Sequence, residues 1–139
     1  MWWPWKKTKA LPEHLKTGEW GEEVAERFLK KKGFKIIGRR VRLDRDELDI
    51  VAQFNGVLVF VEVKTRKNEE FGRAISAVNR GKRASLSRAA VHYLRKLREK
   101  PDFFRFDVVE VIGEKGAGDP QIRHIENAFN LDSKYRLPW

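Results

Sequence analysis

Two acidic residues and a lysine lie in the most apolar stretch of the chain, ELDIVAQFNGVLVFVEVK, residues 47–64. They are Asp49, Glu62 and Lys64, and twelve residues separate the two acids. Carboxylate oxygens are the ligands that a hard cation such as Mg²⁺ prefers, and Mg²⁺ usually keeps several waters that a substrate can replace. The residue types therefore favour a magnesium site with a lysine beside it.

The turn in the middle of this stretch is predicted to bring the two acids together. Asn55-Gly56 between two apolar runs is typical of a β-hairpin with a type I′ turn, which needs positive φ at both central positions. A two-residue loop pairs Phe54 with Val57, and counting outward pairs Asp49 with Glu62. Their Cα atoms are expected to lie only ~4.5 Å apart, as at a non-hydrogen-bonded position of an antiparallel pair.

Such an acidic pair needs a compensating charge. Like charges directly opposite each other destabilise a strand pair, and burial of the sheet face adds a cost of desolvation. A divalent cation would compensate, and so would an ordinary ion network with Lys64 and a nearby arginine. The same register pairs Glu47 with Lys64, and strand alternation puts Lys64 on the face of both acids, opposite the valines at 57, 59, 61 and 63.

A first helix is predicted to supply a third carboxylate. TGEWGEEVAERFLKKK, residues 17–32, has one apolar face, and Thr17 is its expected N-cap. Glu22 lies at the margin of this face, from which it can approach the sheet. Glu19 is the second choice, and both could instead be surface acids that complement the helix dipole.

A second helix is predicted from Ala74 to about Lys100, with Pro101 just beyond it. Lys82 falls near the centre of its apolar stripe. A lysine there either extends past the sheet edge or has an anionic partner, which would be a phosphate or an active-site carboxylate.

The other apolar segments predict strands over residues 34–43, 103–112 and 122–129. Together with the hairpin and the two helices, they give the order α-β-β-β-α-β-β. This order predicts an α/β fold in which a mixed β-sheet is flanked by helices.

Composition limits the possible partners and chemistries. A chain of 139 residues has room for one ordinary domain, and its 30 Lys and Arg against 20 Asp and Glu attract polyanions, nucleic acid first and anionic membrane second. The absence of cysteine excludes disulfides, thiolate nucleophiles and cysteine-ligated zinc. The histidines, which lack metal-ligand spacing, are expected to be structural or on the surface. They are His14, His92 and His124.

No segment has the length of a signal peptide core or of a membrane span, so a cytoplasmic location is expected. The N-terminal MWWPWKK could anchor the protein to an interface, or it could pack on its own domain. A membrane partner is not expected.

Asp49 and the tripeptide Glu62-Val63-Lys64 resemble the PD-(D/E)XK nuclease signature. The wider series of blocks is similar to the YraN-like family of bacterial proteins, which resemble archaeal Holliday-junction resolvases. These blocks are GEWGEEVAERFLKKKGF, ELDIVA, LVFVEVKTR, FGRAISAVNRGKRASL, RFDVV and HIENAF. The resemblance predicts a resolvase-like domain at residues 17–130, with an N-terminal tail at 1–16 and a C-terminal tail at 131–139.

The resemblance implies a restriction-endonuclease-like core and an endonuclease that depends on Mg²⁺ or Mn²⁺. Asp49, Glu62 and the carbonyl of Val63 would hold the metal. Lys64 would lie beside the attacking water, and Glu22 matches the acid that resolvase-like members supply from the first helix. A cation and a lysine together would stabilise the charge that develops during phosphodiester hydrolysis.

The expected substrate is structured or branched DNA in repair or recombination, with Lys82, Arg66 and Arg40 as nucleic-acid contacts and no small-molecule cofactor. A homodimer is expected by analogy, because a four-way junction has two symmetric cleavage points. The alternative is a nucleic-acid-binding protein that has the nuclease fold without turnover.

The chain departs from the usual family pattern at one position. Asp46 precedes Glu47 where the family usually has glycine, which adds an acid near the candidate site. By strand alternation, Asp46 is expected on the other face from Asp49.

Overall fold

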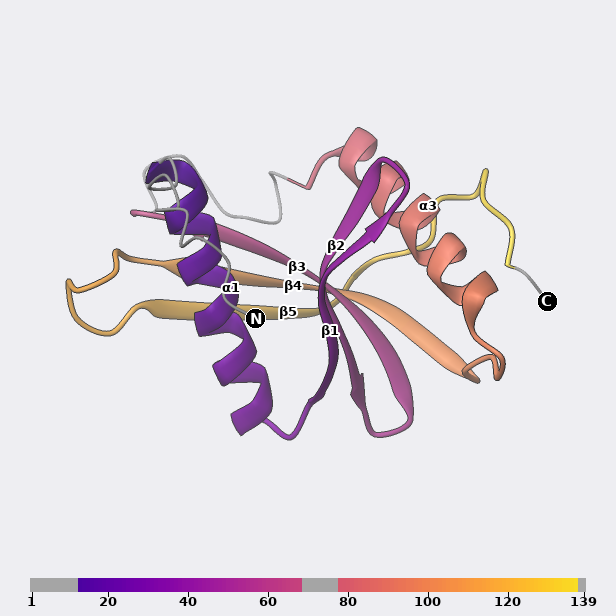
Figure 1. Cartoon of the computed structure of the whole chain (residues 1–139), viewed down its shortest axis with the longest axis horizontal. Helices are drawn as coiled ribbons and strands as arrows, with labels where there is room; N and C mark the ends of the chain where they lie inside the picture. Colours follow the sequence, from indigo (N-terminus) through magenta and orange to yellow (C-terminus); the bar gives the residue numbers. More distant parts are fainter. Residues whose placement is uncertain (1–12, 69–77, 138–139) are drawn as a thin grey trace, which may run out of the picture.

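The strands form one mixed sheet, in which their spatial order is their order in the chain (Figure 1). The computed structural model describes residues 13–68 and 78–137. The strands are β1 (Lys35–Leu43), β2 (Asp46–Phe54), β3 (Val57–Arg66), β4 (Phe103–Ile112) and β5 (Gln121–Phe129), and the helices are α1 (Glu13–Lys31) and α3 (Arg80–Lys96). β3 and β4 are parallel, and the other neighbours are antiparallel. The predicted order is confirmed, and it is consistent with a restriction-endonuclease-like core.

The two described helices cover opposite faces of this sheet, α1 on one side and α3 on the other (Figure 1). Side chains of β3 alternate between two apolar clusters, which explains its almost unbroken apolar run. Leu58 and Phe60 pack in the cluster of α3, whereas Val59 and Val61 pack in the cluster of α1. The valines therefore lie on the face predicted for them, opposite Glu62.

The ends of both helices differ from the prediction. α1 begins at Glu13, so Thr17 lies inside the helix and is not its N-cap. α3 begins at Arg80, because the side chain of Asn79 accepts a hydrogen bond from the Lys82 N–H and so caps the helix there. It ends at Lys96, before an extended backbone at the next residue. Residues 1–12 and 69–77, which include MWWPWKK and part of the predicted second helix, lie outside the described residues.

The predicted hairpin register is confirmed. Asn55 and Gly56 have φ of 49° and 78°, as a type I′ turn requires. The cross-strand partners run in the expected register from Phe54 and Val57 to Ile50 and Val61. Neither described helix is long and apolar enough to cross a membrane.

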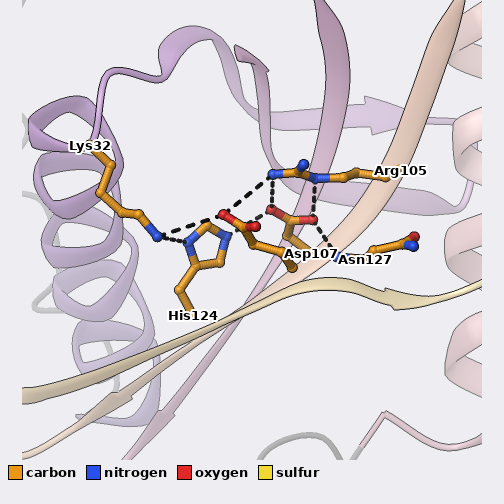
Figure 2. Close-up of polar contacts among 6 residues, drawn as sticks. Lys32, Arg105, Asp107, His124 and Asn127 are labelled. Carbon is orange, nitrogen blue, oxygen red and sulfur yellow. Dashed lines mark hydrogen bonds and ion pairs between the residues drawn. The ribbon is translucent and has the colours of Figure 1, made fainter. Parts of the chain in front are cut away.

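A buried polar network joins the end of α1 to β4 and β5 (Figure 2). Asp107 is fully buried and accepts two hydrogen bonds from Arg105 and one from the Asn127 backbone N–H. One of its oxygens is 2.7 Å from Nε2 of His124, and Nδ1 of the same ring is 2.7 Å from Nζ of Lys32. The ammonium can only donate, so the ring accepts at Nδ1 and carries its proton on Nε2. The expectation of a structural histidine holds for His124.

A close contact between α1 and β3 predicts the effect of one substitution. A Cβ at Gly21 would collide with the Thr65 hydroxyl, whereas a Cβ at Gly18 would meet nothing within 4 Å. Gly21→Ala should lower the free energy of unfolding by about 1–2 kcal/mol, because overpacking outweighs the helix propensity of alanine. Gly18→Ala should raise it by up to about 1 kcal/mol. Urea titration of both variants checks this, and Gly21→Ala/Thr65→Ala should recover the loss.

The buried network predicts a pH dependence of stability. Burial by itself raises the pKa of Asp107, but hydrogen bonds from His124, Arg105 and the Asn127 backbone hold it below the ordinary value. This carboxylate therefore stabilises the fold above its unfolded pKa, and the stabilisation is lost as the pH falls through the lower folded pKa. Asp107→Asn should cost about 2–4 kcal/mol at pH 7 and flatten the loss of stability below about pH 4. Asp119→Asn, in an exposed loop, is the control in urea titrations at each pH.

Candidate metal and nucleic-acid site

The candidate site lies where β2 and β3 separate. Their paired register ends at Ile50 and Val61, one step before the two acids. Beyond that point β2 pairs only with β1, and β3 pairs only with β4. Asp49 bridges the opening with its side chain, because its Oδ2 accepts a hydrogen bond of 2.8 Å from the Val63 N–H. We call this opening the fork.

The separation makes two predicted strand pairs wrong, because neither Asp49 with Glu62 nor Glu47 with Lys64 continues the paired register. Glu47 does not face Lys64: its strand partner is Arg42, and the partner of Lys64 is Glu110 in β4. The register from the turn is correct, but the strands diverge before they reach these residues.

Asp49 and Glu62 nevertheless contact each other through their side chains. Burial, a hydrogen bond with Glu62 and the charge of Glu62 together raise the pKa of Asp49 to about 8. The Val63 N–H and the charge of Lys82 oppose this rise. Without a bound cation, the carboxyl group of Asp49 therefore keeps its proton to a much higher pH than an ordinary aspartate.

Glu62 is the more buried acid and has an unsatisfied oxygen. It is only 5% exposed, and its Oε2 is the one buried side-chain oxygen of the described residues without a hydrogen-bond partner. Nζ of Lys82 lies 3.2 Å from this oxygen, in an ion pair whose angles do not make a hydrogen bond. Lys82, which the sequence places on the apolar stripe of its helix, thus contacts an acid of the candidate site. This contact agrees with one of the two interpretations that the sequence left open, a lysine with an anionic partner.

The third predicted acid, Glu22, is held by an arginine of β1. Nε of Arg40 donates a hydrogen bond of 2.8 Å to Oε1 of Glu22. In the pairing of β1 with β2, Arg39 faces Ile50 and Val41 faces Leu48. Arg40 therefore lies beside Asp49 in the next strand. Its φ of 48° takes it out of the regular strand conformation. Burial raises the pKa of Glu22 despite this bond, and the charge of Asp49 adds to the rise.

Lys64 and Glu22 line one open hollow between α1 and β3. Glu22 comes from α1, and Lys64 follows Val63 along β3, so the hollow lies beside the fork. Lys64 is partly exposed there. A substrate in this hollow would meet both residues.

The donor set of the fork suits a hard divalent cation. The N–H and C=O of one strand residue point to the same side, so the Val63 carbonyl faces the same opening as its N–H. Two carboxylates, one of them with an unsatisfied oxygen, and this carbonyl are oxygen ligands of the kind that Mg²⁺ accepts. Within the described residues, no three His, Asp or Glu side chains lie close enough together to hold an ion. Glu22 therefore lies outside the metal-ligand set in this geometry.

The three predicted nucleic-acid contacts all have acidic partners. Arg40 binds Glu22, and Lys82 binds Glu62. Arg66 has its Nε 3.7 Å from the buried carboxylate of Glu110 and is only 17% exposed in its side chain. The positive charge of each residue therefore partly neutralises an acid of the protein itself.

The position of Asp46 was wrongly predicted. It accepts two hydrogen bonds of 2.7 Å from Arg88 of α3, the helix that also carries Lys82. Strict alternation fails because β2 changes face: Leu48 packs with the α3 cluster, whereas Ile50 packs with the α1 cluster. The partnership with Arg88 could not be found from the sequence, because no pattern links positions 42 residues apart.

Within the described residues, these features define an α/β protein with an acidic fork in a mixed five-stranded sheet and one helix on each face of that sheet. The chain belongs to the Uncharacterised protein family UPF0102, whose profile matches residues 21–111. The matched region includes α1 from Gly21, the fork and α3.

Individual bacterial members of this family are similar over most of their length. A UPF0102 protein of Symbiobacterium thermophilum is 47% identical over 116 residues, which cover 83% of this chain and 97% of that protein. A UPF0102 protein of Koribacter versatilis is 42% identical over 88% of this chain and 85% of its own length. One of Syntrophomonas wolfei is 44% identical, with 81% and 96% covered.

The raised pKa of Asp49 predicts how stability depends on pH when no metal is bound. Between about pH 4 and 8 the folded protein binds a proton that the unfolded chain releases, so stability falls as the pH rises through this range. The loss should be at most about 6 kcal/mol, because one pKa unit corresponds to about 1.36 kcal/mol. Asp49→Asn should remove most of this loss.

Urea titrations in EDTA from pH 4 to 8.5 measure the effect. Asp102→Asn removes an exposed carboxylate outside the fork and should keep the wild-type slope. A wild-type stability that does not fall across this range would contradict the raised pKa of Asp49.

Proposed function

We propose that this protein is a metal-dependent nuclease that hydrolyses phosphodiester bonds in structured or branched DNA. The observation that carries the proposal is the contact between the Asp49 and Glu62 carboxyl groups at the fork, where one oxygen of Glu62 is buried without a hydrogen bond. Two acids in this position repel each other unless a proton or a cation lies between them. A divalent cation would replace the proton of Asp49.

Asp49, Glu62 and the Val63 carbonyl would hold Mg²⁺ or Mn²⁺. When bound, such a cation polarises a phosphoryl oxygen and lowers the pKa of water. Lys64 extends from the next position into the hollow, where its ammonium would stabilise negative charge on the phosphate. Glu22, on the other side of the hollow, would orient the attacking water by accepting a hydrogen bond from it.

The charge distribution supports a nucleic-acid substrate. The chain carries a formal net charge of +10. α3 begins at Arg80 and has basic residues but no acid in its first turn, so the positive end of its dipole lies close to Lys82 and the fork. A phosphate that approaches the fork from the side of α3 would meet this positive end.

Cleavage assays with purified protein test the proposal. Four-way junctions, flaps and single-stranded DNA should be cut in Mg²⁺ or Mn²⁺, and the cutting should stop in EDTA. Asp49→Asn and Lys64→Met should each lower the rate by at least about 100-fold, since the first removes an anionic ligand of the metal and the second removes the ammonium that stabilises charge on the phosphate. Asp102→Asn and Lys35→Met, which change exposed residues, are matched controls. Absence of cutting on every substrate in every divalent metal would refute the enzymatic proposal.

A second candidate is a nucleic-acid-binding protein without turnover. The ion pair of Lys82 with Glu62 favours it, because an internal cation already provides part of the compensation that a metal would provide. This alternative predicts DNA binding that weakens steeply with salt and survives Asp49→Asn. Binding of that kind without cleavage would decide in its favour.

A further inference from the structure

We propose that Lys82 is an internal counter-cation of the fork: its ammonium lies on Glu62 in the metal-free protein, and a divalent cation must displace it. The displaced ammonium is then available to a phosphate of the substrate. This inference rests on the proposed function in one respect, since it uses the same carboxylates as metal ligands.

The contact of Lys82 is with the oxygen that the metal would need. Its Nζ lies 3.2 Å from Oε2 of Glu62, and no hydrogen bond is made to this oxygen. An ammonium at this distance would strongly repel a divalent cation on the same oxygen, because like charges a few ångströms apart repel each other and water screens them little at a buried carboxylate. The ammonium of Lys82 and a divalent cation therefore cannot occupy this oxygen of Glu62 at the same time.

The charge of Lys82 also reaches the other acids near the fork. It lowers the pKa of Asp49, where burial and Glu62 act in the opposite direction. It also contributes to lowering the pKa of Asp46, which depends mainly on the hydrogen bond from Arg88. One ammonium thus acts on three carboxylates, as a bound cation would.

Lys82 is free to move without unfolding α3. Its backbone is fixed, because its N–H is bonded to the Asn79 cap. Its side chain is 39% exposed, whereas that of Glu62 is only 5% exposed. The flexible four-carbon stem of lysine can carry the ammonium from the carboxylate toward solvent without breaking an aligned hydrogen bond.

This arrangement couples metal binding to phosphate binding. Before metal binds, Lys82 weakens the affinity for the cation and is itself engaged by Glu62. After metal binds, the ammonium lies beside the cation and both can contact an anion. A substrate phosphate that binds the released Lys82 would in turn tighten metal binding, because the coupling between two ligands is reciprocal.

Mn²⁺ titration without nucleic acid tests the inference. Isothermal titration calorimetry, with free Mn²⁺ measured by electron paramagnetic resonance, gives the dissociation constant of wild type, Lys82→Gln and Lys96→Gln. Lys82→Gln should bind Mn²⁺ at least about tenfold more tightly than wild type, because the competing charge is gone. Lys96→Gln removes the same charge from an exposed position in the last turn of α3, and its affinity should stay within about twofold of wild type.

Lys82→Met repeats the test with a neutral side chain that cannot donate a hydrogen bond to Glu62, whereas glutamine can. If either folded variant binds Mn²⁺ no more tightly than wild type, or if Lys96→Gln shows the same gain as Lys82→Gln, Lys82 is not a competitor of the metal. The absence of Mn²⁺ binding by all the proteins would also overturn the inference.

These outcomes are separate from those of the cleavage assay. A gain in Mn²⁺ affinity in proteins that cut no DNA would support the role of Lys82 and refute the nuclease. Metal-dependent cleavage by wild type, with no gain of affinity in Lys82→Gln, would support the nuclease and refute the role of Lys82.

Discussion

The separation of β2 from β3 after the Ile50–Val61 partners is the constraint on which the candidate site depends. Buried backbone groups must find partners, and a strand that leaves its neighbour exposes an N–H that has to be satisfied in another way. Asp49 satisfies the Val63 N–H with its carboxylate. This bond places an acid inside the sheet, close to Glu62. The same opening therefore leaves a backbone N–H without a strand partner and brings together two carboxyl groups that need a compensating charge.

The acidic side chains in and beside the fork have cationic partners from different elements of the fold. α3 brings Lys82 to Glu62, while β1 brings Arg40 to Glu22 of α1. The positions of the helices therefore decide how much negative charge remains in the fork. α1 is fixed by its close contact at Gly21 and by the buried network at its other end (Figure 2).

Sequence reasoning succeeded where a local rule decides the structure. Asn55-Gly56 specified the turn, and the turn specified the register, because two consecutive positive φ values permit one geometry of short hairpin. It failed where a capping side chain or a strand twist intervened. The start of α3 depends on the Asn79 cap, and the position of Asp46 depends on a change of face in β2.

The sequence by itself determined the order of the elements, the β2–β3 register and the proximity of Asp49 to Glu62, since apolar periodicity and turn chemistry act over a few residues. Only the tertiary structure decided that the strands part at the acids, that Lys82 lies on Glu62 and that Arg40 holds Glu22. Each of these contacts joins residues from separate elements. Their geometry follows from how the helices pack on the twisted sheet, which no short-range pattern encodes.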